Sequence, residues 1–511
     1  MSQEKIASLH SRYNPQGEAD RYINALSLDE KTRFFILIEP GLCYMVAPLK
    51  KRIPNAKIIA LHADVPPAPP AADGSPAHPP PDSRWFPQMG IPVQDFLERE
   101  IPDSAAAEIR LLEWRPALAV YGGLYLTLVE ESAEFIKRSD ANVRTLNAFG
   151  KRWFRNFFRN LGIIRAIIRP APLSIPILVT GAGPSLNDAI PLIHDAPRSS
   201  LFTLAVSSSA AALRAAEITP NMLISTDGGF WAAFHLFDSF RGKSASCLLA
   251  ASLNAALPSQ CENLSILPIS DGSLWQTLIL KGLKIPFIAL PQRGTVSASA
   301  LDLAFALTSG DIFIAGLDLA NNDIRSHARP YSFDNFMEER SGRFNPVYSQ
   351  SYKRSSLMKA GGSYGVYASW FEKQLAAYPK RLYSLGKNNR VFDSTQALGT
   401  KLSRGREDAE NIAFETIPLR NKGTLSREAF FILEKALRDP HHSTVLQREL
   451  GALLFSDKTD PSDKTDPFDK TDPSTGDLIE ALRSSLSEPE LRRGFAGNVS
   501  GKVPIGESFN G

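Results

Sequence analysis

The residues best suited to chemistry form a glycine-rich turn, Val179-Thr-Gly-Ala-Gly-Pro-Ser-Leu-Asn187, between an apolar run and a helical pattern. Gly181 and Gly183 would let the backbone approach a ligand closely. Pro184 suits the first turn of a helix, and Ser185 can cap that helix or donate to a phosphate. A helix N-terminus after a parallel strand attracts anions, because N–H groups and the helix dipole converge there. The turn lacks the third glycine of the dinucleotide fingerprint and the lysine of a P-loop, so its spacing fits a phosphate site and a plain tight turn equally.

Two aspartates follow apolar runs that read as strands of one sheet. Asp227 comes after Met222–Thr226, and Asp318 comes after Ile312–Leu317. In open α/β sheets the carboxyl ends of the strands line the ligand crevice, so these carboxylates could hold ribose hydroxyls, a metal or a substrate. Each aspartate would also serve as the N-cap of a following helix, and the pattern leaves both interpretations open.

A histidine lies close to the second aspartate along the chain. His327 ends the polar loop at 320–327, nine residues after Asp318. A histidine in a loop beyond a strand end can act as a general base or balance phosphate charge, although most loop histidines do neither. A second polar segment, 345–354, has the composition of a phosphate-binding lid or of an ordinary polar loop; its candidate residues are Tyr348, Tyr352, Lys353 and Arg354.

The elements that must position these residues alternate along 175–400. Short apolar runs predict strands at 175–180, 201–206, 222–226, 245–250, 264–269, 287–290 and 312–317. Alanine-rich segments between them, such as 208–217 and 297–307, predict helices. This alternation is typical of a doubly wound α/β sheet, which we expect to form the central domain.

The sequence before this domain predicts a smaller α/β domain over residues 1–135. Apolar runs at 34–39 and 57–62 predict buried, parallel strands. The segment 65–82 is rich in Pro and Ala, which favours a solvated, extended insertion. Residues 136–174 predict a helical connector in which basic residues are interleaved with the aromatic pairs Trp153-Phe154 and Phe157-Phe158. Basic residues among aromatics can indicate nucleic-acid binding, but the near-neutral chain favours an amphipathic helix with an aromatic core face.

After the central domain the pattern becomes charged and helical. We expect a helical region over 401–455, clearest at 426–437. Three hexapeptides of the type Ser-Asp-Lys-Thr-Asp-Pro fill 456–473 and predict a flexible linker, because they are too polar to bury a core. The tail, 474–511, contains one further helical segment at 477–491.

Composition bounds the kind of protein. The 511 residues suggest about three domains. Lys and Arg number 57 against 54 Asp and Glu, a net charge of +3, which argues against coating nucleic acid or a membrane surface. Three cysteines are too few for a disulfide framework or a zinc site. The most apolar long stretch, 111–129, contains Glu113 and Arg115, and the N-terminus has no apolar core. We therefore expect a soluble, cytoplasmic protein with no nucleic-acid partner and no membrane span.

Several segments, taken in order, resemble the motility accessory factor family of flagellin glycosyltransferases. The turn Gly-Ala-Gly-Pro-Ser-Leu at 181–186 resembles the nucleotide loop of that family and of bacterial sialyltransferases of similar fold. The other matching segments are 9–15, Ile-Thr-Pro at 218–220 with the strand ending in Asp227, 294–300, 310–320 and 391–395. The resemblance covers about 9–45 and 175–400. The central domain is shared with the archaeal 6-hydroxymethylpterin diphosphokinase, so the resemblance implies an MptE-like, sialyltransferase-like, Rossmann-type domain.

The resemblance implies a glycosyltransferase that moves a nonulosonic sugar, of the sialic or pseudaminic type, from a CMP donor to Ser or Thr of flagellin. It implies the CMP-activated sugar as donor and no particular cofactor beside it. The implied catalytic residues are Asp227, His327 and Asp318. The implied nucleotide-binding residues are Gly181, Gly183, Pro184, Ser185, Ser207, Thr226 and Asp227.

Two alternatives stay open at this point. A diphosphokinase would need Mg²⁺ bridging ATP phosphates, held by carboxylates such as Asp227 and Asp318. A noncatalytic flagellar assembly or scaffold protein would keep the fold without turnover.

Overall fold

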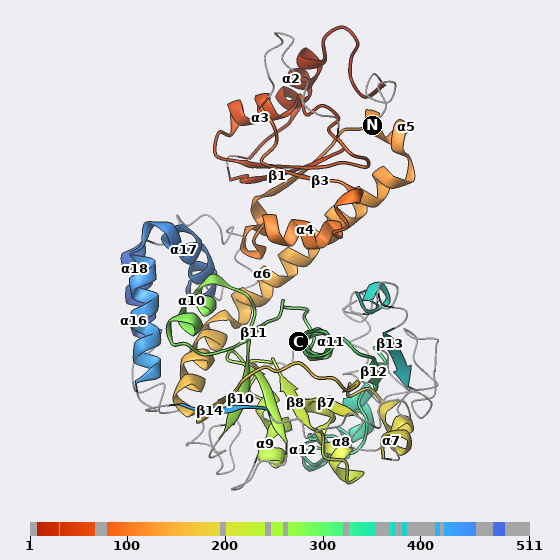
Figure 1. Cartoon of the computed structure of the whole chain (residues 1–511), viewed down its shortest axis with the longest axis vertical. Helices are drawn as coiled ribbons and strands as arrows, with labels where there is room; N and C mark the ends of the chain where they lie inside the picture. Colours follow the sequence, from red (N-terminus) through yellow and green to blue (C-terminus); the bar gives the residue numbers. More distant parts are fainter. Residues whose placement is uncertain are drawn as a thin grey trace. The chain divides into compact units, whose positions relative to one another are not determined.

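The computed structural model describes residues 8–29, 31–66, 79–194, 201–240, 247–258, 264–319, 326–352, 368, 370–374, 378, 381–385, 414–419, 424–455 and 474–485. Lys353, Arg354, the segment 391–395 and the repeats at 456–473 lie outside these residues, as does most of the insertion predicted at 65–82. The chain divides into two units, Met1–Ala148 and Phe149–Gly511. The division falls inside one long helix, α6 (Gly123–Ile163) (Figure 1).

The first unit is built on a four-stranded sheet in which every strand pairs in parallel with its neighbours. The strand order is β3-β2-β1-β4. The strands are β1 (Phe34–Ile38), β2 (Lys57–Leu61), β3 (Ser83–Trp85) and β4 (Ile109–Glu113), and the helices include α2 (Pro15–Ala25), α3 (Val46–Arg52), α4 (Val93–Glu100) and α5 (Pro116–Tyr121). All five residues of β1 are buried. The two parallel strands predicted at 34–39 and 57–62 are therefore confirmed.

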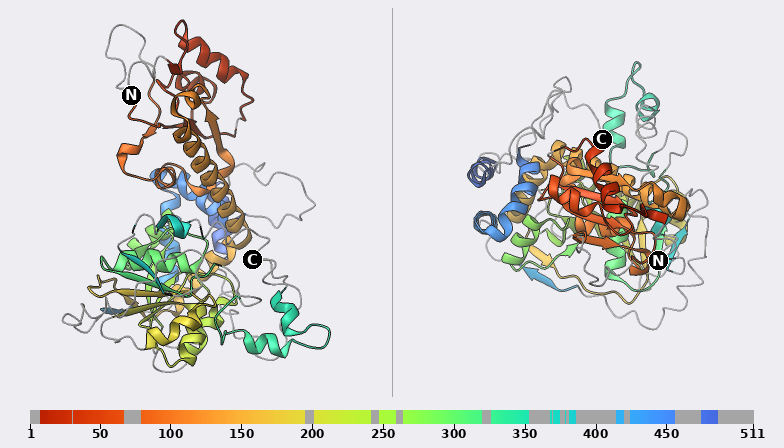
Figure 2. Two further views of the ribbon diagram at one scale, coloured as in Figure 1. Left: turned by 90° about the vertical axis from the view of Figure 1, so that its right-hand side faces the viewer. Right: turned by 90° about the horizontal axis from the view of Figure 1, so that it is seen from above.

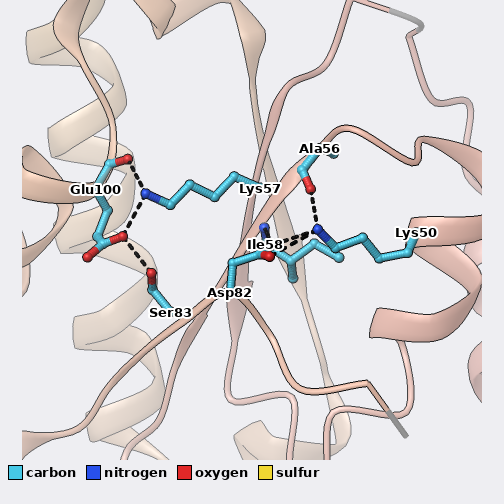
Figure 3. Close-up of polar contacts among 7 residues, drawn as sticks. All are labelled: Lys50, Ala56, Lys57, Ile58, Asp82, Ser83 and Glu100. Carbon is cyan, nitrogen blue, oxygen red and sulfur yellow. Dashed lines mark hydrogen bonds and ion pairs between the residues drawn. The ribbon is translucent and has the colours of Figure 1, made fainter. Parts of the chain in front are cut away.

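Polar contacts hold the short edge strand β3 and helix α4 in place (Figure 3). Asp82, just before β3, accepts a bond of 2.7 Å from the N–H of Ile58 and pairs with Lys50 at 2.8 Å. Lys57 of β2 pairs with Glu100 of α4 at 2.8 Å. The contacts to Ile58 and Lys57 tie the start of β3 and the end of α4 to β2.

The second unit is built on a ten-stranded sheet. Its order is β13-β12-β6-β7-β8-β9-β10-β5-β14, with β11 beside β10. All neighbours pair in parallel except β14 with β5. The strands are β5 (Ala166–Ile168), β6 (Ile177–Thr180), β7 (Phe202–Val206), β8 (Met222–Ser225), β9 (Leu248–Ser252), β10 (Ser265–Ser270), β11 (Ile288–Ala289), β12 (Ile312–Ala315), β13 (Leu382–Leu385) and β14 (Thr416–Pro418). The predicted doubly wound α/β domain is confirmed.

The direction of strand addition reverses at β6. From β6 the chain adds β7, β8, β9 and β10 on one side, and later returns to add β12 and β13 on the other. Figure 1 shows α11 (Val296–Leu307) on one face of this sheet and α8 (Ala210–Ala215) and α9 (Ala232–Phe240) on the opposite face. In such sheets the ligand crevice opens beyond the carboxyl ends of the strands at the point of reversal. That point lies between β6 and β12.

The aromatic residues of α6 form a core face, as predicted. Phe154, Phe157 and Phe158 are fully buried. Trp275 of α10 (Leu274–Gly282) packs against them, with its ring centroid 5.4 Å from that of Phe154 and 4.7 Å from that of Phe157. No helix in the described part of the chain is both long and apolar enough to cross a membrane.

Helices α16 (Leu425–Leu437) and α17 (Pro440–Leu454) pack beside α10, and α18 (Thr475–Ser485) packs against α17 (Figures 1 and 2). The helices predicted at 426–437 and within 477–491 correspond to α16 and α18. The predicted connector and helical region also contribute strands, β5 and β14, which sequence reasoning missed because each has three residues.

Candidate functional site

The glycine turn and the end of β12 form one hydrogen-bonded unit at the point of strand reversal. The N–H of Gly181 donates to the carbonyl of Ala315 at 2.7 Å, and the N–H of Gly183 donates to the carbonyl of Gly316 at 2.7 Å. The two loops that follow β6 and β12 are therefore joined by backbone bonds where the fold predicts a ligand crevice.

Close backbone approach explains both glycines of the turn. A Cβ atom on Gly181 would lie 2.3 Å from the carbonyl oxygen of Gly316, and one on Gly183 would lie 2.5 Å from Oδ2 of Asp318. Contacts this short leave no room for a side chain. Gly181 and Gly183 are thus needed for the approach of the neighbouring strand end, whether or not a ligand also comes close.

Asp318 fixes the start of helix α7 (Leu186–His194). Its side chain is 7% exposed, and Oδ2 accepts a bond of 2.7 Å from the N–H of Ser185. The hydroxyl of Ser185 donates to Oδ1 through a second, very short bond. Burial raises the pKa of Asp318, the two bonds from Ser185 lower it, and Asp188 raises it again, so the net shift is upward. Each oxygen of Asp318 thus accepts one bond from Ser185, and the carboxylate holds the residue that precedes α7.

The turn itself offers a ligand few backbone donors. The N–H groups of Gly181, Gly183, Ser185 and Leu186 all donate within the protein. Among described residues 181–186, Ala182 is the one whose N–H has no intramolecular acceptor, and Pro184 has no N–H. An anion at this turn would therefore rely on Ala182 and on side chains from neighbouring strand ends.

The loop that contains His327 docks directly on the glycine turn. The N–H of Ala328 donates to the carbonyl of Ala182 at 2.8 Å. The side chain of Asn187 bonds both backbone groups of Arg329, accepting from its N–H at 3.0 Å and donating to its carbonyl at 2.8 Å. Three hydrogen bonds thus bring the histidine loop to the edge that the sequence analysis indicated.

His327 is held on two sides. Its Nδ1 lies 2.8 Å from the hydroxyl oxygen of Ser326. Its ring stacks on Tyr331 with a centroid separation of 4.2 Å and an interplanar angle of 20°. The ring orientation is therefore fixed by a polar partner and an aromatic partner, as a general base requires.

Asp227 is the exposed carboxylate of the predicted set. Its Oδ1 accepts a bond of 2.7 Å from the N–H of Gly229, forming a local turn, and its carbonyl accepts from Ala256 at 2.9 Å. The carboxylate faces solvent beyond the end of β8. Of the two aspartates, Asp227 is thus the one open to a ribose hydroxyl or a Mg²⁺ ion.

The remaining predicted residues lie along the same edge. Ser207 begins a short 3-10 helix (Ser207–Ser209) directly after β7 and is buried, and Thr226 is half-buried after β8. The hydroxyl of Ser209, which sequence reasoning missed, bonds the carbonyl of Val206 at 2.8 Å and lies 3.2 Å from the hydroxyl oxygen of Thr180. These residues connect the ends of β6 and β7.

A second polar cluster, also missed, follows β9 and β10. Oδ2 of Asp271 accepts from Gln276 at 2.8 Å, from Gln292 at 3.1 Å and from Asn254 at 3.4 Å. Oδ1 of Asn254 is buried and has no hydrogen-bond partner. The side chain of Asn156 on α6 donates to the carbonyl of Asn254 at 2.9 Å. The only sequence signal was the position of these polar residues just after apolar runs.

No group of three or more potential metal ligands occurs within the described residues. Mg²⁺ commonly needs only one or two carboxylates when substrate phosphates supply the other ligands. With Asp318 engaged by Ser185, Asp227 is the predicted carboxylate that fits such an ion.

The sheet defines the class of this domain as doubly wound α/β, and known proteins resemble parts of the chain. Residues 151–323 match the family model described as "6-hydroxymethylpterin diphosphokinase MptE-like". The chain therefore contains an MptE-like domain, as the sequence resemblance predicted.

Two further similarities concern longer stretches. A protein of Treponema pallidum (strain Nichols), described as "Uncharacterized protein", is 27% identical over 286 residues, which is 56% of this chain and 61% of that protein. The chain thus matches about three fifths of that relative's length. A solved structure described as a MAf glycosyltransferase from Magnetospirillum magneticum AMB-1 is similar, with a TM-score of 0.43, 11% identity, and coverage of 93% of this chain and 82% of that one. A likeness this distant says nothing about activity.

Proposed function

We propose that this protein is a glycosyltransferase that takes a CMP-activated nonulosonic sugar and transfers the sugar to a Ser or Thr hydroxyl of flagellin. The observation that carries the proposal is the docking of the His327 loop on the glycine turn at the reversal point, through Ala328–Ala182 and Arg329–Asn187. This contact supports pairing a base at His327 with a phosphate site at the glycine turn. The ordered sequence resemblance to the motility accessory factor family supports it.

On the donor side, the exposed carboxylate of Asp227 would accept hydrogen bonds from the ribose hydroxyls. The N–H of Ala182 and nearby hydroxyl groups, including Ser207 and Thr226, would face the phosphate. Asp318 would act indirectly, by holding Ser185 and so the start of α7. Donors fixed in advance stabilise the charge that develops on the departing phosphate.

On the acceptor side, His327 would remove the proton. In the tautomer that donates Nδ1–H to Ser326, Nε2 carries the lone pair. The acceptor oxygen attacks the anomeric carbon as its proton passes to Nε2. The bond between that carbon and the phosphate oxygen breaks, and CMP leaves with the electron pair. The His327→Gln variant should transfer sugar far more slowly while binding CMP with wild-type affinity, because the base contacts the acceptor and not the nucleotide.

A second candidate function is a Mg²⁺-dependent diphosphokinase, which the family description of the 151–323 match favours. The two candidates differ in their nucleotide and in their need for metal. A CMP donor needs no ion, whereas ATP phosphates would be bridged by Mg²⁺ at Asp227.

Calorimetric titration of CMP and of ATP into the wild-type protein, in EDTA and in Mg²⁺, separates the two. We expect CMP to bind in EDTA and the Asp227→Asn variant to bind it more weakly. The matched control is Glu480→Gln, an exposed carboxylate on α18. Binding of ATP that needs both Mg²⁺ and Asp227, without CMP binding, would favour the diphosphokinase. Binding of neither nucleotide would favour a noncatalytic scaffold.

A further inference from the structure

Aromatic side chains from two distant segments meet on the surface of the second unit. One segment follows β8 and enters α9, and the other follows the His327 loop and enters α12 (Asp334–Glu339). The centroid of the Trp231 ring lies 5.4 Å from that of Phe234, 5.0 Å from Phe336 and 5.8 Å from Phe333. We call this cluster the aromatic band; it comprises Phe230, Trp231, Phe234, Tyr331, Phe333 and Phe336.

The aromatic band is continuous with the candidate base. Phe333 contacts Tyr331 with a centroid separation of 5.4 Å. Tyr331 in turn stacks on His327 at 4.2 Å. The band therefore begins at the residue that would take the acceptor proton and extends away from it along α9 and α12.

The far end of the aromatic band is exposed. Phe230 is 46% and Phe234 is 45% exposed, and their rings are neighbours at 5.6 Å. Exposed apolar residues scattered singly need no explanation, but a contiguous group with a polar rim marks an interaction site. The rim here includes Glu338 and Arg340, and the Arg340 guanidinium lies 4.2 Å from the centroid of the Phe336 ring.

The chemistry of the band favours one of the two substrates. A CMP-activated sugar carries hydroxyl groups, which can donate to the carboxylate of Asp227, and a phosphate, which can accept from the N–H of Ala182. Both groups suit the polar strand ends. Aromatic rings supply apolar contact area with little loss of conformational entropy, as in protein recognition surfaces. A segment of polypeptide with apolar side chains beside its Ser or Thr would cover the rings and place its hydroxyl at His327.

We propose that the aromatic band is the acceptor-binding surface, and that it selects polypeptide segments in which aliphatic or aromatic side chains flank the hydroxyl residue. The inference rests on the proposed function, because it assigns a role to His327 in the same reaction. It adds residues, Phe230 and Phe234 above all, that act in acceptor recognition and not in donor binding.

The test uses the full chain with both exposed rings replaced, Phe230→Ser with Phe234→Ser. The matched control is Phe431→Ser, which replaces an exposed ring (64%) on α16. We measure the KM for purified flagellin in the transfer reaction, the affinity for CMP, and the fluorescence anisotropy of labelled flagellin without donor. The double variant should raise the KM and weaken flagellin binding about tenfold, with CMP affinity and kcat at saturating flagellin unchanged. Serine peptides flanked by Leu and Val should bind the wild type better than peptides flanked by Gly and Asn.

Three outcomes would overturn the inference. Unchanged flagellin binding in the double variant would show that the rings do not contact the acceptor. An equal loss of CMP-sugar affinity would assign the rings to the donor. A wild-type dimer that the double variant dissociates, with acceptor binding intact, would assign them to a second copy of this chain. The anisotropy measurement needs no turnover, so it tests the aromatic band independently of the transfer reaction. A wild-type protein that binds flagellin through these rings but does not bind CMP would refute the proposed function and leave the role of the rings intact.

Discussion

Replacing Glu449 with glutamine should change how the free energy of unfolding of the second unit depends on pH. Glu449 of α17 accepts backbone bonds at the start of α10, from Leu274 at 2.9 Å and Trp275 at 3.1 Å. Burial raises the pKa of Glu449 from 4.5 to about 7; the two N–H bonds lower it and Asp271 adds a smaller upward contribution. The carboxylate thus joins two packed helices while it titrates near neutral pH.

The sign and size follow from this shift. A carboxyl group whose pKa is raised on folding stabilises the folded state below its unfolded pKa, and that contribution is lost as the pH rises through the folded value. The rise in the pKa of Glu449 from 4.5 to about 7 corresponds to a free-energy difference of about 3 kcal/mol, since one pKa unit is worth about 1.36 kcal/mol. Glutamine does not titrate. The stability of Glu449→Gln relative to wild type should therefore increase by about 3 kcal/mol between pH ~4.5 and pH ~8.

Urea unfolding followed by tryptophan fluorescence at several pH values measures this difference. The matched control is Glu428→Gln, an exposed carboxylate on α16. Its curve shows how much of the change comes from replacing any glutamate with glutamine. The free energy of unfolding of Glu449→Gln could instead differ from that of the wild type by the same amount at every pH. That result would show that the carboxyl is not buried against α10 as described.

The remaining predictions concern the edge of the central sheet and the linker. The Gly183→Ala variant should lower stability by about 1–3 kcal/mol, because its Cβ would lie 2.5 Å from Oδ2 of Asp318; an unchanged melting temperature would contradict that packing. The Ser185→Ala variant should cost about 1–3 kcal/mol, since a bond to a buried carboxyl is lost; a neutral change in thermal unfolding would show that this bond does not hold Asp318. Deleting 456–473 should leave CMP affinity unchanged in calorimetry, and a large loss would refute the linker interpretation.

Most strands of the larger sheet, and β1 and β2 of the smaller one, were predictable because they are short apolar runs bounded by turn residues, whereas β3, β4 and β13 were not predicted. The run at 34–39 and the run at 312–317 each contain a fully buried strand. Elements of three residues, such as β5 and β14, give no pattern that separates them from loop sequence. Their pairing depends on neighbours distant in sequence, which a single chain does not reveal.

The candidate site was predictable in its residue types but not in its contacts. The sequence placed Gly183, Asp227 and Asp318 after strands, where the structure has them. It offered a ligand or an N-cap as the partner of Asp318, whereas the carboxylate bonds Ser185, which is 133 residues away. A side chain at position 183 would meet Asp318, which is also distant in the sequence. A Gly183 variant therefore reports on packing as well as on ligand binding.

The most direct test of the central claim is the intact mass of flagellin after incubation with this protein and a CMP-activated nonulosonic sugar in EDTA. The account predicts that flagellin gains the mass of the sugar, that CMP is released in equal amount, and that His327→Gln abolishes both changes. The account would be contradicted if flagellin stayed unmodified and no CMP were released, while the same protein preparation bound ATP only in the presence of Mg²⁺.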